Sequence, residues 1–264
     1  METNNTFSFQ RFRLLCNQSL VINKRLITLW LGGFAGILFI ALFIFQLAAD
    51  FVRWENESYL STFVSLFFVM GIIYVSHSFP AFSSKERSMT YLMLPASASE
   101  KYIFELLTRI VLFIVVVPFI FWVVANLEGS IVHQFVPGLT HYRCTFDTLW
   151  SGLLNHGNWN GWGVMLAFQG VLFVFCSFFA GASHFAKSAF LRTLLTFIIL
   201  MASFSLYSYL IARILGMNGL HPGNDRVLFI HSKEDGIVYF ALATTLVNLC
   251  LLAIAWFKLK EKEA

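Results

Sequence analysis

The chain has 264 residues, of which 58% are hydrophobic and 12% are charged, whereas a soluble domain has roughly 25% charged residues. So few polar groups exclude an ordinary soluble globule of this length, because its surface would carry large apolar patches. The net charge is +4. A basic rim against anionic lipid headgroups accounts for that excess, so no nucleic-acid partner is expected. The composition therefore predicts an integral membrane protein.

Six segments have the length of about 20 apolar residues that crosses a bilayer. They lie near residues 26–48, 60–80, 103–125, 162–183, 189–212 and 237–257. The first is too long for the core of a signal peptide and lacks a small-residue cleavage site, so we expect it in the mature chain. The sequence predicts an all-α, polytopic membrane protein of about six helices in a single transmembrane domain, residues 1–264.

Lysine and arginine predict the orientation of these spans, because cytoplasmic segments carry an excess of both. With the N-terminus inside, most of the 18 Lys and Arg residues fall in the inside segments. Both termini are therefore expected in the cytoplasm. The connection 126–161 is then expected outside, as a solvated loop whose histidines have no spacing typical of metal ligands.

An amphipathic segment precedes the first predicted span. At 100° per residue Phe9, Phe12 and Leu15 share one face of a helix, whereas Arg11 and Arg13 lie on the other. Such a helix can lie in the membrane interface, with its arginines at headgroup phosphates. We predict an elbow helix leading into the first span; the alternative is a generic basic anchor that only sets the topology.

The inside connection 81–102 carries the signals of a short helix that stops at a proline. Ser83 or Ser84 can cap the start of this helix, with Glu86 near its first turn. Pro95 ends it, because proline cannot continue a helix. A short cytoplasmic helix of this kind could transmit force from a partner to the two spans that it joins. The alternative is an ordinary structured loop.

The third span is predicted to begin with its own cap. Ser97 or Ser99 can cap it, with Glu100 in the first turn, where a carboxylate suits the positive end of the helix. Glu105 and Arg109 follow at i, i+4, with the acid first, which is the order that favours an ion pair on one helix face.

The stretch Lys85–Arg109 resembles the cytoplasmic loop of ABC-2-type permeases, in particular small bacterial members of the Bacteroidetes type. Those carry a tyrosine, a leucine-rich turn, then L-P-A-S and an E-K pair before the third span. Two further segments are similar to that family: the FxRF motif at Phe9–Phe12, near the start of the chain, and Trp256–Glu263, at its end. The resemblance implies a coupling helix that docks on a separate or fused ABC ATPase subunit. The residues that match this coupling motif are Ser84, Lys85, Glu86, Arg87, Leu94, Pro95, Ala96, Ser97, Glu100 and Lys101.

Two missing features bear on function. No G-x-x-x-x-G-K-[ST] phosphate-binding loop occurs, so we expect that this chain does not hydrolyse ATP. It is not expected to be an enzyme or to bind a cofactor, and ATP and Mg are expected on the partner subunit. No carboxylate lies in the middle of a predicted span, and Glu105 is expected near the inner face. A proton- or sodium-coupled carrier usually needs such a carboxylate, so that class is disfavoured.

The sequence therefore predicts the permease subunit of an ABC-type exporter in a bacterial inner membrane, moving an amphipathic or lipid-like substrate. Its expected partners are the ATPase subunit, a second permease in a homo- or heterodimer and the lipid bilayer. The alternatives are an assembly or structural membrane protein without transport, and a membrane-embedded enzyme. The enzyme is disfavoured because no cluster of acid, base or metal ligands is evident.

Small residues and cysteines give weaker signals. Gly32, Gly33 and Gly36 in the first span and Gly181 in the fourth allow helices to approach closely. The four cysteines are far apart and show no C-x-x-C spacing, so neither a disulfide framework nor a metal site is expected.

Overall fold

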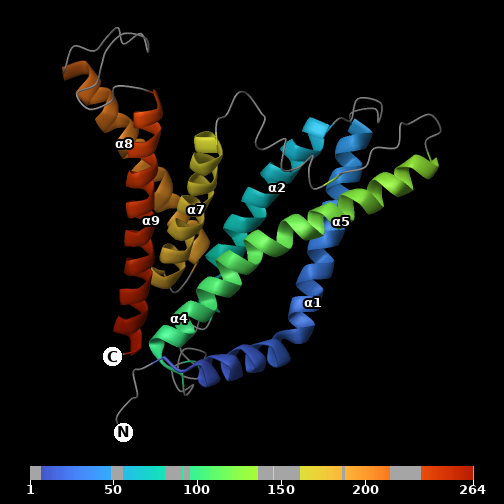
Figure 1. Cartoon of the computed structure of the whole chain (residues 1–264), viewed down its shortest axis with the longest axis horizontal. Helices are drawn as coiled ribbons and strands as arrows, with labels where there is room; N and C mark the ends of the chain where they lie inside the picture. The colour runs from blue at the N-terminus through green and yellow to red at the C-terminus, as the bar shows by residue number, and fades with distance from the viewer. Residues whose placement is uncertain are drawn as a thin grey trace. The chain divides into compact units, whose positions relative to one another are not determined.

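The computed structural model describes residues 7–48, 56–80, 91, 96–135, 145, 161–185, 188–214 and 233–263, and its regular elements there are all helices. In chain order they are α1 (Phe9–Ala48), α2 (Asn56–Ser76), α4 (Ala98–Leu106), η2 (Leu107–Val111), α5 (Leu112–Phe135), α7 (Gly161–His184), α8 (Ala189–Ile214) and α9 (Lys233–Glu263) (Figure 1).

Within those residues five helical segments are long and apolar enough to cross a membrane. They are Ile27–Ala48, Ser58–Ser76, Ala98–Phe135, Ala189–Tyr207 and Ala241–Lys262. The predicted fourth span falls on α7, where the apolar stretch Phe168–His184 is shorter. Large apolar side chains such as Val115, Ile199 and Leu246 are each more than 60% exposed, which suits a lipid surrounding. The predicted all-α polytopic membrane fold is confirmed.

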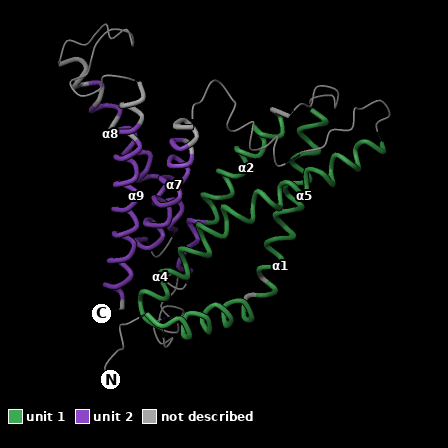
Figure 2. The backbone as a smooth tube through the Cα atoms, viewed as in Figure 1, with its two compact units in different colours: residues 1–74, 93–160 green, residues 75–92, 161–264 purple. Residues whose placement is uncertain are grey.

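The helices form two compact units (Figure 2). Unit 1 comprises residues 1–74 and 93–160, and unit 2 comprises residues 75–92 and 161–264. Each has its own packed interior.

The interior of unit 1 lies where α1, α2 and α5 meet. Leu38 and Leu42 of α1 are fully buried there, beside Phe63 of α2 and Phe121 of α5. The rings of Phe63 and Phe121 lie 4.9 Å apart. Because lipid tails are as apolar as these side chains, close packing rather than the hydrophobic effect holds such helices together.

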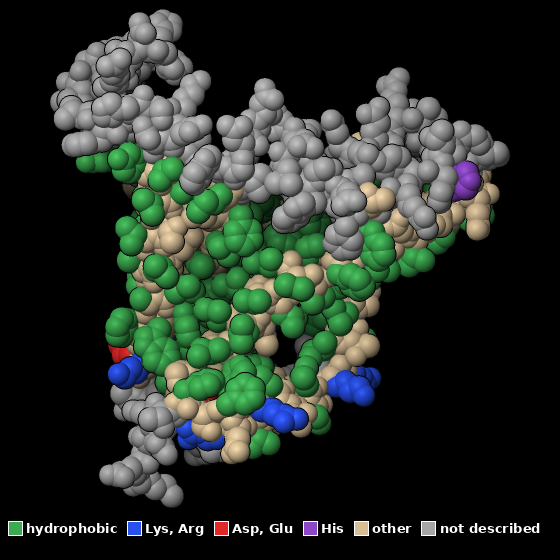
Figure 3. Space-filling view, in the orientation of Figure 1, with side chains coloured by type: hydrophobic (Ala, Val, Ile, Leu, Met, Phe, Trp, Pro, Cys, Tyr) green, Lys and Arg blue, Asp and Glu red, His purple; other side chains and the backbone are tan. Residues whose placement is uncertain are grey.

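The predicted elbow helix is the first part of α1, which continues without interruption into the first span. The ribbon turns between its amphipathic part and its apolar part (Figure 1). Lys and Arg side chains gather along this amphipathic part of unit 1 in the space-filling view (Figure 3). Phe9 is 71% exposed, whereas Arg11, Phe12 and Leu15 are partly covered. The covered face therefore includes an arginine that the helical pattern assigned to the headgroup side.

The third span is longer at both ends than predicted. The run α4–η2–α5 is continuous from Ala98 to Phe135, so residues 126–135 belong to a helix and not to the expected outside loop. The polar residues that suggested the end of the span form hydrogen bonds along the helix instead. The Asn126 amide donates to the Trp122 carbonyl at 2.8 Å, and the Ser130 hydroxyl donates to the Asn126 carbonyl at 2.7 Å.

Helix α2 ends at Ser76, before the predicted end of the second span at residue 80. The Ser78 backbone N–H and hydroxyl both donate to the Val75 carbonyl, at 3.0 and 2.6 Å. Phe79 then takes a positive φ of 56°, a conformation that no helix can continue. These contacts close the helix end within unit 2.

In unit 2 the central helix α7 packs against both α8 and α9. Gln169 of α7 accepts from the Thr244 hydroxyl and donates to the Thr245 hydroxyl of α9, both at 2.7 Å. The Lys262 ammonium donates to the Ser183 carbonyl at the C-terminal end of α7, also at 2.7 Å. Paired polar groups of this kind join helices in an apolar surrounding, where an unmatched group would be costly.

The glycines differ in their surroundings. A Cβ atom placed on Gly181 would overlap the side chain of Thr193 on α8, whereas one on Gly32, Gly33 or Gly36 would meet no atom of the described chain within 4 Å. The predicted close helix contact is therefore confirmed at Gly181. The first-span glycines make no such contact within the part of the chain that the structure covers.

Candidate functional site

The start of α4 is closed by a capping box. Ser97 is the N-cap residue: its hydroxyl accepts from the Glu100 backbone N–H at 3.4 Å, and the Ser97 backbone N–H donates to the Glu100 carboxylate at 3.0 Å. Ser97, rather than Ser99, therefore caps the helix. The Ser99 hydroxyl lies 2.9 Å from that of Ser97. The predicted position of Glu100 in the first turn is confirmed.

The same carboxylate ties α4 to the beginning of α1. Its Oε1 atom accepts from the Ser8 backbone N–H at 2.8 Å and lies 3.2 Å from a guanidinium nitrogen of Arg11. Glu100 is completely buried and the Arg11 side chain is 32% exposed. Bonds between charged partners are stronger than neutral ones. We call Ser8, Arg11, Ser97 and Glu100 the Glu100 junction.

The predicted coupling residues fall into two groups. Ala96, Ser97, Glu100 and Lys101 are described, and the last two are buried, so they hold the segment in place rather than present a surface. The others lie outside the described residues: Ser84, Lys85, Glu86, Arg87, Leu94 and Pro95.

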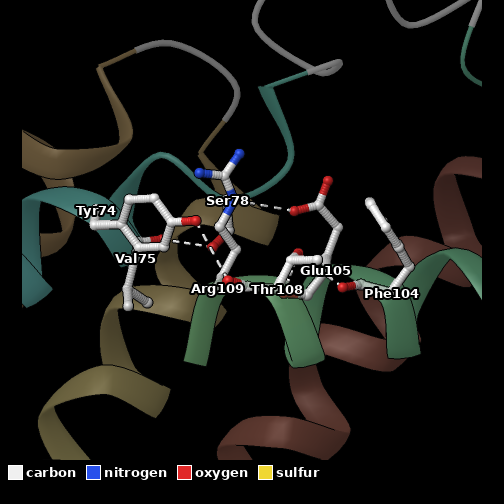
Figure 4. A network of polar contacts seen from close by, with 7 residues as sticks. All are labelled: Tyr74, Val75, Ser78, Phe104, Glu105, Thr108 and Arg109. Carbon is white, nitrogen blue, oxygen red and sulfur yellow. Dashed lines mark hydrogen bonds and ion pairs between the residues drawn. The ribbon is translucent and has the colours of Figure 1, made fainter. Parts of the chain in front are cut away.

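The predicted ion pair at the start of the third span is confirmed. The Arg109 Nε atom lies 3.4 Å from a Glu105 carboxylate oxygen. The Arg109 guanidinium also lies over the ring of Tyr74 of α2, 4.9 Å from its centroid, and the Tyr74 hydroxyl donates to the Thr108 carbonyl at 3.3 Å. Figure 4 shows these side chains together. The pair therefore also links this helix to α2, which helical spacing alone could not indicate.

A π-turn, η2, carries this arginine. The Leu112 backbone N–H bonds to the Leu107 carbonyl, five residues back, instead of the four of an α-helix. The Thr108 hydroxyl donates back to the Phe104 carbonyl at 2.8 Å. Single π-turns inside helices are frequent at functional sites, and this one lies beside the contact with Tyr74.

A buried carboxylate lies further along the same helix. Glu128 of α5 is completely buried. The Gln46 amide nitrogen of α1 lies 2.7 Å from its Oε2 atom and 2.8 Å from the hydroxyl of Tyr59 on α2. The Glu128 Oε1 atom has no hydrogen-bond partner among the residues that the structure describes. We call Gln46, Tyr59 and Glu128 the Glu128 cluster.

The expectation that no carboxylate lies in the middle of a span is not contradicted, because Glu128 lies toward the C-terminal end of the third span, beyond its predicted boundary. Glu128 belongs to the apolar segment Ala98–Phe135, and sequence analysis missed it because the predicted span stopped at residue 125. One signal could have raised the question: Gln46 is an amide near the end of an otherwise apolar run, and a buried amide needs partners.

The described residues form no metal centre. Among the described parts of the chain no group of three or more His, Cys, Asp or Glu side chains could hold a metal ion. Cys16, Cys176 and Cys250 form no disulfide there, and Cys144 lies outside the described residues.

Comparison with models of protein families, with curated proteins and with solved structures found no match. The Glu100 junction and the Glu128 cluster are therefore the features of the molecule on which functional conclusions depend.

Proposed function

We propose that the chain is the membrane-spanning permease subunit of an ABC-type exporter, driven by a separate ATPase subunit. The observation that supports this most is the Glu100 junction. It joins the start of the first helix to the start of the third span, where the predicted coupling segment enters that span.

The junction suits force transmission. A force that the ATPase applies to residues 84–97 would act on Ser97 and Glu100. The Glu100 carboxylate is bonded to Ser8 and Arg11 at the beginning of α1. The amphipathic part of α1 and the long helix α4–η2–α5 would then move together. Rigid-body movement of packed helices is a common form of switching between states.

In this proposal both termini and the coupling segment face the bacterial cytoplasm. Two such chains form the dimer, and ATP and Mg are held by the ATPase partner. The substrate in this proposal is amphipathic or lipid-like. The competing proposal is an assembly or structural membrane protein, which needs no ATPase.

The first test concerns the ATPase. Reversing both charges of the coupling segment, Lys85→Glu with Arg87→Glu, should lower the amount of co-purifying ATPase at least about tenfold, because losing charge pairs at an interface costs more than one tenfold step in affinity. The measurement is quantitative mass spectrometry of detergent-purified material.

The matched control for this variant is Lys258→Glu with Lys260→Glu, which reverses two charges near the end of α9. It should leave the co-purifying ATPase unchanged. An ATPase that stays fully bound to the Lys85/Arg87 variant would contradict coupling at this segment. Wild-type material without any ATPase would favour the structural or assembly role.

The second test concerns topology. Ser88→Cys, in a chain without its native cysteines, should not react with a membrane-impermeant maleimide in intact cells and should react after permeabilisation. Removing Cys144 matters most, since it lies in the predicted outer loop. Ser151→Cys in that loop is the control and should react in intact cells. Labelling of the residue-88 cysteine from outside would contradict the proposed orientation.

A further inference from the structure

The Glu128 cluster contains a carboxyl group without a compensating charge. The apolar core of unit 1 includes Leu42 of α1 and Val124 of α5, which come one helical turn before Gln46 and Glu128 in the sequence. Gln46 offers a neutral amide, and Oε1 accepts no hydrogen bond from the described residues. An ionised carboxylate buried in this way is strongly disfavoured unless a cation joins it.

The titratable groups around Glu128 supply no such cation within the described residues. Helix α1 contributes Gln46 and apolar side chains, and α2 contributes Tyr59, whose hydroxyl accepts from the Gln46 amide. On α5 itself the nearest titratable side chain is His133, which is exposed. The simplest cation that fits the site is a proton.

We propose that Glu128 is a proton-binding site within the membrane-spanning part of the chain. It holds its proton in the packed arrangement of α1, α2 and α5, and releases it to water when these helices separate. The step transfers one proton between the carboxyl oxygen and water and makes or breaks no other covalent bond.

The cluster can accommodate the neutral carboxyl. Rotating the Gln46 amide by half a turn exchanges its nitrogen and oxygen, two atoms of similar size. The amide oxygen can then accept from the protonated Glu128 and from the Tyr59 hydroxyl, in place of the two bonds that the nitrogen makes to the same atoms. The bonds from Gln46 to Glu128 Oε2 and to Tyr59 can thus be kept with the proton present.

The location of the Glu128 cluster gives the proton a short route to water. Gln46 lies close to the end of α1, and Tyr59 close to the beginning of α2, so the cluster lies near an end of both spans. Along its own helix Glu128 is about 35 Å from Glu105, at 1.5 Å per residue. The proton site is thus distinct from the Glu105–Arg109 pair, and it goes beyond the proposed coupling to an ATPase.

Infrared spectroscopy of the purified chain in lipid bilayers tests the proposal. At neutral pH the wild type should show the C=O stretching band of about one protonated carboxyl per chain, which shifts in heavy water. Glu128→Gln should abolish the band, and it should fold because an amide has the size and neutrality of a protonated acid. Glu105→Gln, which removes a carboxylate paired with Arg109, is the control and should leave the band intact.

Two results would overturn the proposal. One is a wild type without a protonated-carboxyl band at neutral pH, or with a band that Glu128→Gln leaves unchanged. The other concerns Arg53, which lies in the connection from α1 to α2 outside the described residues. If the band appears only in Arg53→Gln, this arginine is the counter-ion and Glu128 is ionised in the wild type.

Discussion

Glu100→Ala should lower the stability of unit 1 by about 2–4 kcal/mol. The substitution removes the acceptor for the Ser8 and Ser97 N–H groups and leaves the Arg11 guanidinium without its carboxylate. Losing one member of a buried, charged hydrogen-bond set costs about this much. The apparent unfolding midpoint in detergent should fall by roughly 5–15 °C.

Two variants make this result specific. Glu100→Gln keeps the size and one acceptor oxygen, so its midpoint should lie between those of Glu100→Ala and the wild type. Glu261→Ala removes a carboxylate that pairs with Lys258 at the surface, where it is 68% exposed. No measurable change is expected there, because surface ion pairs contribute little. Equal effects of Glu100→Ala and Glu261→Ala would mean that the junction does not stabilise unit 1.

Gly181→Ala should destabilise unit 2 by about 1–3 kcal/mol, the usual cost of overpacking. The added methyl would overlap Thr193, which is buried on α8, so α7 and α8 must move apart or the threonine must shift. The measurement is the unfolding midpoint of the detergent-purified chain.

A control variant and a rescuing variant for Gly181→Ala are available on α7 and α8. In Gly170→Ala, also on α7, the added methyl meets no atom of the described residues within 4 Å. This variant should be neutral or slightly stabilising, because alanine favours helix more than glycine does. Thr193→Ala removes the two atoms nearest to the new methyl but leaves a Cβ atom at 2.8 Å. Combining it with Gly181→Ala should therefore restore only part of the loss. A Gly181→Ala chain as stable as Gly170→Ala would show that the contact is not tight.

The features that the sequence predicted correctly are local. Apolar runs of sufficient length indicated the spans, because the bilayer imposes a minimum length on a helix. The capping of α4 and the Glu105–Arg109 pair followed from spacings of three and four residues on one helix. The resemblance to ABC-2-type permeases and the functions that it implies stay predictions.

The features that sequence analysis missed join residues far apart in the chain. Arg11 bonds to Glu100, and Gln46 to Glu128, and no periodicity within one helix points to such partners. The end of the third helix was placed too early for the same reason. Asn126 and Ser130 resemble the start of a loop until their bonds along the helix are seen, and Glu128 resembles a solvated residue until Gln46 is placed beside it.

The π-turn η2 determines which side of α5 meets α1. Its wider winding holds one residue more than an α-turn, which is equivalent to rotating everything after it by about 100° around the helix axis. Glu105 precedes this turn and Glu128 follows it on the same continuous helix. Rewinding η2 into regular α geometry would therefore rotate Glu128 away from Gln46 without unfolding the helix. A conformational change beside Arg109 would in this way expose the Glu128 carboxyl, far along the same helix.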